Sequence, residues 1–153
     1  MNVVVEALAP NVPASPRLMR EVAMLDRACE AVLQSGEWLT AAQIAELAGL
    51  SGRNPSAQPN KWKKKGQIFA IRHAGVDYFP GYGLDADAGY RPLKSLARVI
   101  EVLAGHKDGW GMACWFRADN SLLGGRRPRD LLGAEPERVI EAAQDEIQQV
   151  LHG

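Results

Sequence analysis

Apolar residues recur at three- and four-residue spacing along most of this chain, and this period constrains the fold more than any other feature. The first such stripe follows a serine-proline pair, which is typical of a helix cap and first turn. It consists of Leu18, Val22, Leu25, Cys29 and Val32. Further stripes cover residues 93–103, 110–116, 128–132 and the segment from Pro136 onward. The period therefore predicts a mainly α fold.

One segment departs from the helical period. Residues 68–72 and 76–80 are rich in β-branched and aromatic side chains and are separated by a turn at Ala74-Gly75. We expect a β-hairpin here. Residues 81–92, rich in Gly, Asp and Ala, have the composition of a connection between two halves. The expected fold class is mainly α with one β-hairpin.

The segment before the hairpin has the pattern of a helix-turn-helix. Thr40 and Gln43 have the spacing of a capping box at the start of a short helix, and Gly49 stands where that helix should end. A second helix is expected to begin near Ser56 and to use Trp62 as its buried anchor. With the hairpin as a wing, the pattern predicts a winged helix-turn-helix-like region.

The formal net charge of zero, from 18 basic and 18 acidic residues, hides a basic segment. Between Glu46 and Asp77 every charged residue is a lysine or an arginine. In a helix-turn-helix the second helix reads base edges, and neighbouring cations contact phosphates. A lysine triplet alone is more often a solvated surface, but the capping box, the turn glycine and the hairpin together favour DNA binding. The candidate DNA-binding residues are Ser51, Arg53, Asn54, Ser56, Gln58, Asn60, Lys61, Lys63, Lys64, Lys65 and Arg72.

The most specific stretch is DGWGMACWFRADNSLLGGRRPRDLL, residues 108–132. It resembles the toxin-binding domain of the Xre/MbcA/ParS antitoxins, in which a tryptophan-rich helix is followed by an Asn, a Leu-Gly segment and a Pro-x-Asp-Leu-Leu turn. The matching residues are Trp110, Trp115, Phe116, Asn120, Leu123, Gly124, Gly125, Pro128, Asp130, Leu131 and Leu132. Upstream, KWKKKGQIFAI, YFPGYGLD and RPLKSLARVIEVL look like the DNA-binding half of one branch of that family. The resemblance covers about residues 40–146.

The resemblance implies the antitoxin of a type II toxin-antitoxin system. Such a protein would bind and neutralise a RES-domain toxin, which consumes NAD or transfers ADP-ribose, and would repress its own operon. The residues it points to for toxin binding are Trp115, Arg117, Asn120, Arg126, Arg127, Arg129, His152 and Gly153.

The same residues also have structural interpretations. Core packing is the commoner role for any one tryptophan, and Asn120 and the glycine pair suit a tight turn. For the arginines a solvated turn is an equal alternative, although guanidinium groups can also grip carboxylates or phosphates bidentately.

The predicted organisation has three parts. Residues 1–14, which contain two prolines, form a flexible arm. Residues 15–92 form the DNA-binding region, and residues 93–153 form the toxin-binding domain. We expect a homodimer that acts on operator DNA and on a toxin protein.

No enzyme, metal or cofactor chemistry is expected. The histidines lack metal-ligand spacing, and the glycines lack the context of a phosphate-binding loop. Cys29 and Cys114 lie in apolar helical patterns and are expected to be buried thiols. No run of about 18 apolar residues and no basic signal-peptide start occur, so a cytoplasmic protein without a membrane span is expected.

Two alternatives stay open. The first is a stand-alone winged-helix transcriptional regulator whose C-terminal helices dimerise or sense a ligand. The second is a phage-type adaptor protein that binds no operator.

Overall fold

The computed structural model describes residues 15–152, with the side chain of Asp26 excepted. The predicted arm over residues 1–14 and the predicted toxin contact Gly153 lie outside the described residues. The chain falls into two compact units, with the boundary between Ser35 and Gly36.

The first unit contains helix α2, Pro16–Gln34. The Ser15 hydroxyl caps it by accepting a hydrogen bond from the amide of Leu18 at 3.1 Å, and Pro16 occupies the first turn, where no amide donor is needed. The predicted amphipathic helix and its start are confirmed.

The second unit begins with strand β1, Trp38–Leu39, followed by helices α3, Ala41–Leu47, and α4, Ala57–Lys64. The predicted capping box is present: the Gln43 amide donates to Thr40 Oγ1 at 3.2 Å, and the Thr40 amide donates to Gln43 Oε1 at 2.9 Å. Gly49 has a φ of +62°, as its position after the helix requires. Trp62 is buried and anchors α4, as predicted.

The predicted hairpin is confirmed, with one correction. Strands β2, Ile71–His73, and β3, Val76–Pro80, pair antiparallel around the left-handed Ala74 and Gly75. The first strand was expected to start at residue 68, but Ile68 and Phe69 lie buried just before it. β1 pairs with the other side of β3, so the sheet order is β1-β3-β2.

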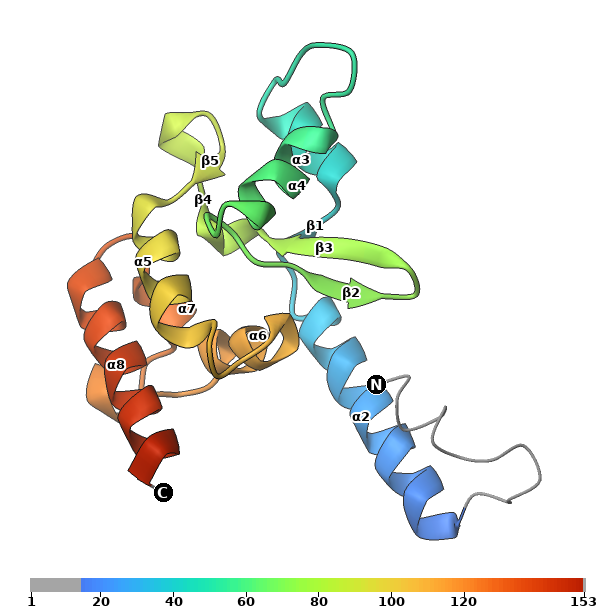
Figure 1. Cartoon of the computed structure of the whole chain (residues 1–153), viewed down its shortest axis with the longest axis vertical. Helices are drawn as coiled ribbons and strands as arrows, with labels where there is room; N and C mark the ends of the chain where they lie inside the picture. The colour runs from blue at the N-terminus through green and yellow to red at the C-terminus, as the bar shows by residue number, and fades with distance from the viewer. Residues whose placement is uncertain (1–14, 153) are drawn as a thin grey trace. The chain divides into compact units, whose positions relative to one another are not determined.

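The segment between the hairpin and the last helices is more ordered than a plain connection. It contains the 3₁₀ turns η1, Gly81–Gly83, and η2, Ala86–Ala88, and the short antiparallel strands β4, Leu84–Asp85, and β5, Arg91–Pro92. We call β4, η2 and β5, residues 84–92, the ribbon. Figure 1 shows it above α5, on the same side as α3 and α4.

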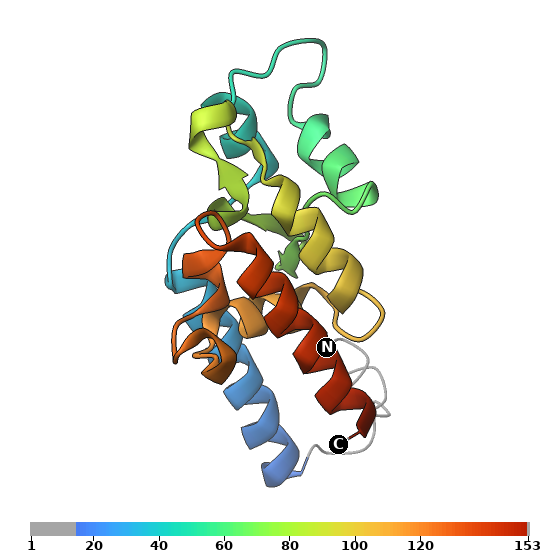
Figure 2. The same ribbon diagram turned by 90° about the vertical axis from the view of Figure 1, so that its left-hand side faces the viewer.

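The rest of the chain is helical: α5, Lys94–Leu103; α6, Gly109–Arg117; the 3₁₀ turn η3, Ser121–Leu123; α7, Pro128–Leu131; and α8, Pro136–His152. Helices α5 and α8 pack side by side (Figures 1 and 2). Leu96, Leu103 and Val139 are among their fully buried side chains. The fold is therefore mainly α with a small antiparallel sheet.

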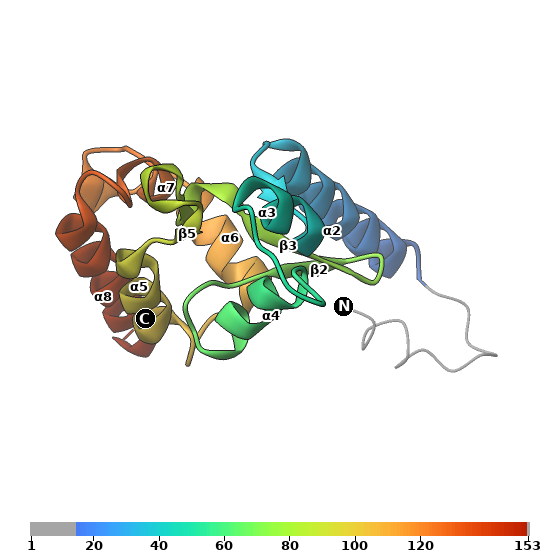
Figure 3. The same cartoon turned by 90° about the horizontal axis from the view of Figure 1, so that it is seen from above.

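A shared core joins the early and late parts of the second unit. Phe69, just before β2, stacks on Phe116 of α6 with ring centroids 5.8 Å apart. Helix α6 starts beside β2 (Figure 3) at Gly109, where a Cβ atom would collide with the carbonyl of Ala70. The absence of a side chain at Gly109 is thus what allows α6 to approach the strand.

The expectation of two buried thiols is wrong. Cys114 is exposed on α6, and Cys29 of α2 is partly exposed. The apolar neighbours of Cys114 suggested burial, but the buried face of this short helix is filled by Met112, Ala113, Trp115 and Phe116. Cys114 therefore lies on the opposite, exposed face.

Candidate nucleic-acid interface

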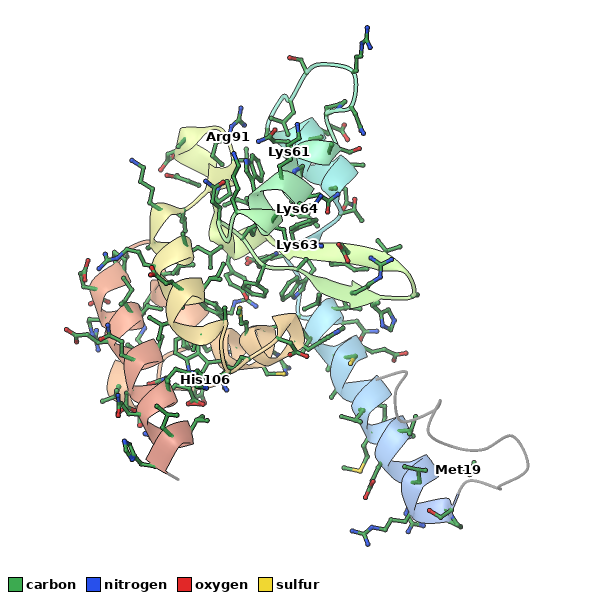
Figure 4. The ribbon with its side chains drawn as sticks, in the orientation of Figure 1. Met19, Lys61, Lys63, Lys64, Arg91 and His106 are labelled. Atoms are coloured by element: carbon green, nitrogen blue, oxygen red, sulfur yellow. The ribbon has the colours of Figure 1, made fainter. Side chains whose placement is uncertain are left out.

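Three lysines lie on one face of α4 and its C-terminal cap. Lys61, Lys64 and Lys65 are spaced i, i+3 and i+4, so their side chains leave the helix on the same side. All three are exposed, and within residues 15–152 none of their ammonium groups has a hydrogen bond or an ion pair. We call Lys61, Lys64 and Lys65 the lysine face; Figure 4 labels two of them along α4.

Two further predicted DNA contacts, Lys63 and Arg72, are ion-paired within the protein although their side chains are partly or largely exposed. Asp77 of β3 accepts from Lys63 Nζ at 2.8 Å and from Arg72 Nη1 at 3.0 Å. Its side chain is only 17% exposed, which acts to raise the carboxyl pKa, but the hydrogen bonds and charges of Lys63 and Arg72 outweigh this and the pKa is lowered. Asp77 therefore fastens the hairpin to α4 and partly neutralises both cations.

A hollow of about 700 Å³ opens beside the turn between α3 and α4. Its polar lining comes from Ser51, Arg53, Asn54, Gln58, Lys61 and Arg91. Among the described residues that line it there is no carboxylate. We call this the turn hollow. Lys61 belongs both to it and to the lysine face, so the two form one continuous cationic surface.

The predicted base-reading residues divide between this turn and α4. Ser51, Arg53 and Asn54 lie before the helix, because α4 begins only at Ala57. Asn54 is partly occupied: its Oδ1 accepts from the Ser56 hydroxyl at 3.1 Å, and Ser56 caps no amide with its side chain. Gln58 and Asn60 are half-buried in the helix itself. The exposed turn residues and the α4 residues Gln58 and Lys61 thus lie around the same hollow, where one partner can contact both.

Three of the seven described residues predicted for toxin binding have structural roles in the fold: Trp115, Asn120 and Arg129. Trp115 is only 7% exposed and packs edge-on against Phe116, with 5.1 Å between ring centroids, so it offers no surface anchor. Asn120 is half-buried and shapes a turn: its Oδ1 accepts from the Leu122 amide at 3.0 Å, and its carbonyl accepts from the Gly125 amide at 2.9 Å. Both residues therefore have structural roles.

The three arginines of the motif differ from one another. Arg129 is 11% exposed, bonds to Glu37 at 2.9 Å, and lies 5.0 Å from the ring centre of Tyr82. Burial raises the pKa of Tyr82, so this tyrosine stays neutral under the cation. Arg126 and Arg127 are exposed and make only loose ion pairs, at 3.9 Å, to Glu135 and Asp119.

The remaining two described candidates for toxin binding, Arg117 and His152, are also exposed. Arg117 and Arg127 line a shallow hollow of about 290 Å³ together with Cys114. His152 is the last residue of α8 and lies on the surface.

Sequence reasoning missed Asp77, which pairs with Lys63 and Arg72, and Arg91, which belongs to the cationic surface. Asp77 lies directly opposite Arg72 in the hairpin register, so a cross-strand pairing argument could have found this ion pair. Arg91 lies in the ribbon, 26 residues after the expected end of the basic helix at Lys65, and no local pattern signals its position.

Comparisons with known proteins add a fold and no function. No family model matches the chain, and no curated protein matches it. The chain is similar to a solved structure titled "NMR structure of Rv2175c", with a TM-score of 0.58 and 23% sequence identity. The likeness covers 71% of this chain and 80% of that chain. At this identity the likeness speaks for the fold alone.

Within residues 15–152, no helix combines the length and the apolar character needed to cross a bilayer. Within the same range there is no group of three or more His, Cys, Asp or Glu residues placed to hold a metal ion.

Proposed function

We propose that this protein binds DNA as a winged helix-turn-helix regulator, with α3 and α4 as the two helices and β2–β3 as the wing. The observation that carries the proposal is the lysine face, whose three ammonium groups have no partner within the described chain. Cations that a fold leaves unpaired on one helix face suit the regular negative charge of a phosphate backbone.

The geometry around this face supports the same role. An α-helix with its side chains is about 10–12 Å across, so α4 fits the major groove of B-DNA, which is about 12 Å wide. Trp62 and Pro59 are buried on the opposite side, so the polar side of α4 is the one left for a partner. Asp77 holds Arg72 of the wing at a fixed place beside α4. Gln58 is the candidate for contacts with base edges.

The test removes the charge of Lys61, Lys64 and Lys65 by substitution with alanine. The affinity for a duplex should fall for every sequence, and the slope of log K against log salt should flatten by about 2.7, since each lost phosphate contact changes it by about 0.9. Fluorescence anisotropy at several salt concentrations measures both quantities.

The matched control removes three positive charges elsewhere. Lys94, Arg98 and Arg138 are exposed residues on α5 and α8, so their replacement by alanine changes the net charge equally. An equal loss of affinity in both triple variants would mean that binding follows net charge and not the lysine face. A wild-type protein that binds no duplex even at low salt would refute the proposal.

A second candidate function is the antitoxin suggested by residues 108–132. The observation that favours it is that Arg117, Arg126 and Arg127 stay exposed with weak ion pairs or none within the described residues. These guanidinium groups could bind a RES-domain toxin, while the DNA-binding half represses the operon as a dimer in the cytoplasm.

Co-expression tests this second candidate. Replacement of Arg117 and Arg127 by glutamate should abolish neutralisation of a co-expressed RES-domain toxin and leave the salt slope of DNA binding unchanged. The lysine-face variant should still neutralise the toxin. A wild-type protein that forms no complex with such toxins and does not restore growth would leave the stand-alone regulator as the function.

A further inference from the structure

The ribbon brings an additional arginine to the cationic surface. Arg91 lies in β5, and its Nη1 donates to the carbonyl of Gly89 at 2.8 Å and to that of Ala48 at 3.3 Å. Ala48 is the C-terminal cap of α3. The positive guanidinium group thus lies at the negative end of that helix, where the last carbonyls stabilise it. Figure 4 shows Arg91 near the Lys61 end of α4.

These two bonds fix one nitrogen and leave the rest of the group available. A guanidinium has five N–H donors, and in the described chain only Nη1 of Arg91 has an acceptor. The edge formed by Nη2 and Nε is the one that binds phosphate bidentately. Because the side chain is exposed yet already oriented, it loses little rotamer freedom when it binds.

The backbone around Arg91 is held in an uncommon conformation. Gly89 has a φ of +70° and Tyr90 a φ of +58°, and the latter is unfavourable for a side chain of this size. The Tyr90 amide donates to the Asp85 carbonyl at 2.8 Å, which closes the ribbon. This strained tip places Arg91 against the end of α3.

We infer that Arg91, Arg53 and Lys61 form a phosphate clamp at the turn hollow, and that the clamp takes a backbone phosphate of the DNA bound by α4. This inference rests on the proposed function and extends the interface to the ribbon. The three cations line the hollow together with Ser51 and Gln58, and no carboxylate from the described residues opposes them. The hollow is open and polar, as an extended phosphodiester strand requires.

The test compares Arg91→Ala with Arg91→Lys in duplex binding. Arg91→Ala should flatten the salt slope by about 0.9, the value for one phosphate contact, and weaken binding to all sequences alike. Arg91→Lys keeps the charge and should keep the slope. The control is Arg138→Ala, since Arg138 is an exposed arginine of α8 outside the hollow; it should leave both slope and affinity unchanged.

Thermal unfolding separates binding from a structural role. If Arg91 only braces the ribbon against α3, then Arg91→Ala and Arg91→Lys will lower Tm while the slope stays at the wild-type value, and the clamp is refuted. If the wild type binds no duplex, the proposed function fails instead.

Titration with inorganic phosphate, followed by the NMR resonances of Arg91, distinguishes a free anion from a DNA phosphate. Saturation at millimolar or lower phosphate, combined with an unchanged duplex slope in Arg91→Ala, would assign the hollow to small anions and overturn the inference. Weak or no response to free phosphate, with a flattened duplex slope, supports it.

Discussion

Two stretches of the chain carry residues that suggest binding: residues 51–65, within the basic segment, and the tryptophan-arginine segment, residues 108–132. In the structure, their side chains differ in exposure and in the partners they have. In the first segment the lysine face stays exposed without partners in the described chain. In the second, Trp115 is buried, Asn120 shapes a turn, and Arg129 is paired with Glu37 and lies over the ring of Tyr82.

The difference shows how to separate binding residues from structural ones. A charged or aromatic residue whose hydrogen bonds and contacts are complete within the fold contributes mainly to stability. A cation left in solvent next to other such cations gains a partner only through binding. By this criterion we propose the first segment as an interface, and the second is mainly scaffold with a few exposed arginines.

The largest expected effect is a loss of stability on replacing a buried residue of the tryptophan-arginine segment. Trp115→Ala should lower the free energy of unfolding by about 3–5 kcal/mol, because it removes a large buried ring from beside Phe116. Urea denaturation measures this value. Arg117→Ala, on the exposed side of the same helix, is the control and should stay within about 0.5 kcal/mol of wild type. Equal stability of the two variants would contradict the comparison.

A smaller effect should distinguish two arginines of one motif. Arg129→Ala loses the bond to Glu37 and the contact with Tyr82, and should cost about 1–2 kcal/mol. Arg127→Ala loses only a loose, exposed ion pair and should be near neutral. If the order were reversed, Arg127 and not Arg129 would be the structural residue.

The smallest effect concerns Asp77, which joins the β2–β3 hairpin to α4. Since the folded-state pKa of Asp77 is lowered, its contribution to stability is present above the usual carboxyl pKa of 3.8 and is lost as the pH falls through the folded value. The loss of stability below pH 3.8 should therefore be smaller in Asp77→Asn than in wild type. Acid titration of the unfolding free energy tests this.

The same variant sharpens the comparison in DNA binding. Asp77→Asn frees Lys63 and Arg72 from a shared negative charge, so its salt slope should be steeper by about one unit. A flatter slope would mean that Asp77 is needed to position these cations and that their charge alone does not suffice.

Local patterns predicted most of the fold. The Ser15 cap, the Thr40 and Gln43 capping box, and the turn at Gly75 depend on neighbours within a few residues, so the sequence signals them directly. β1 and the ribbon strands were not predicted, because strands of two residues are too short to show an alternating pattern.

The residues of the candidate site could be predicted only where their spacing along one helix places them on its exposed face. The lysine face follows from i, i+3, i+4 spacing around the buried Trp62. By contrast, Arg91 reaches Ala48 across 43 residues, and Arg129 reaches Glu37 across 92. Such contacts depend on tertiary packing, which period and composition do not encode, so one cation of the surface was missed and one structural arginine was taken for an interface residue.

The measurement that tests the central claim most directly is an NMR titration of the full chain with duplex DNA, in which the backbone amide shift of every residue is followed. The account predicts the largest shifts in residues 51–65 and around Arg72 and Arg91, with small shifts in residues 117–129. The largest shifts in residues 117–129, or shifts spread evenly over the chain, would contradict it.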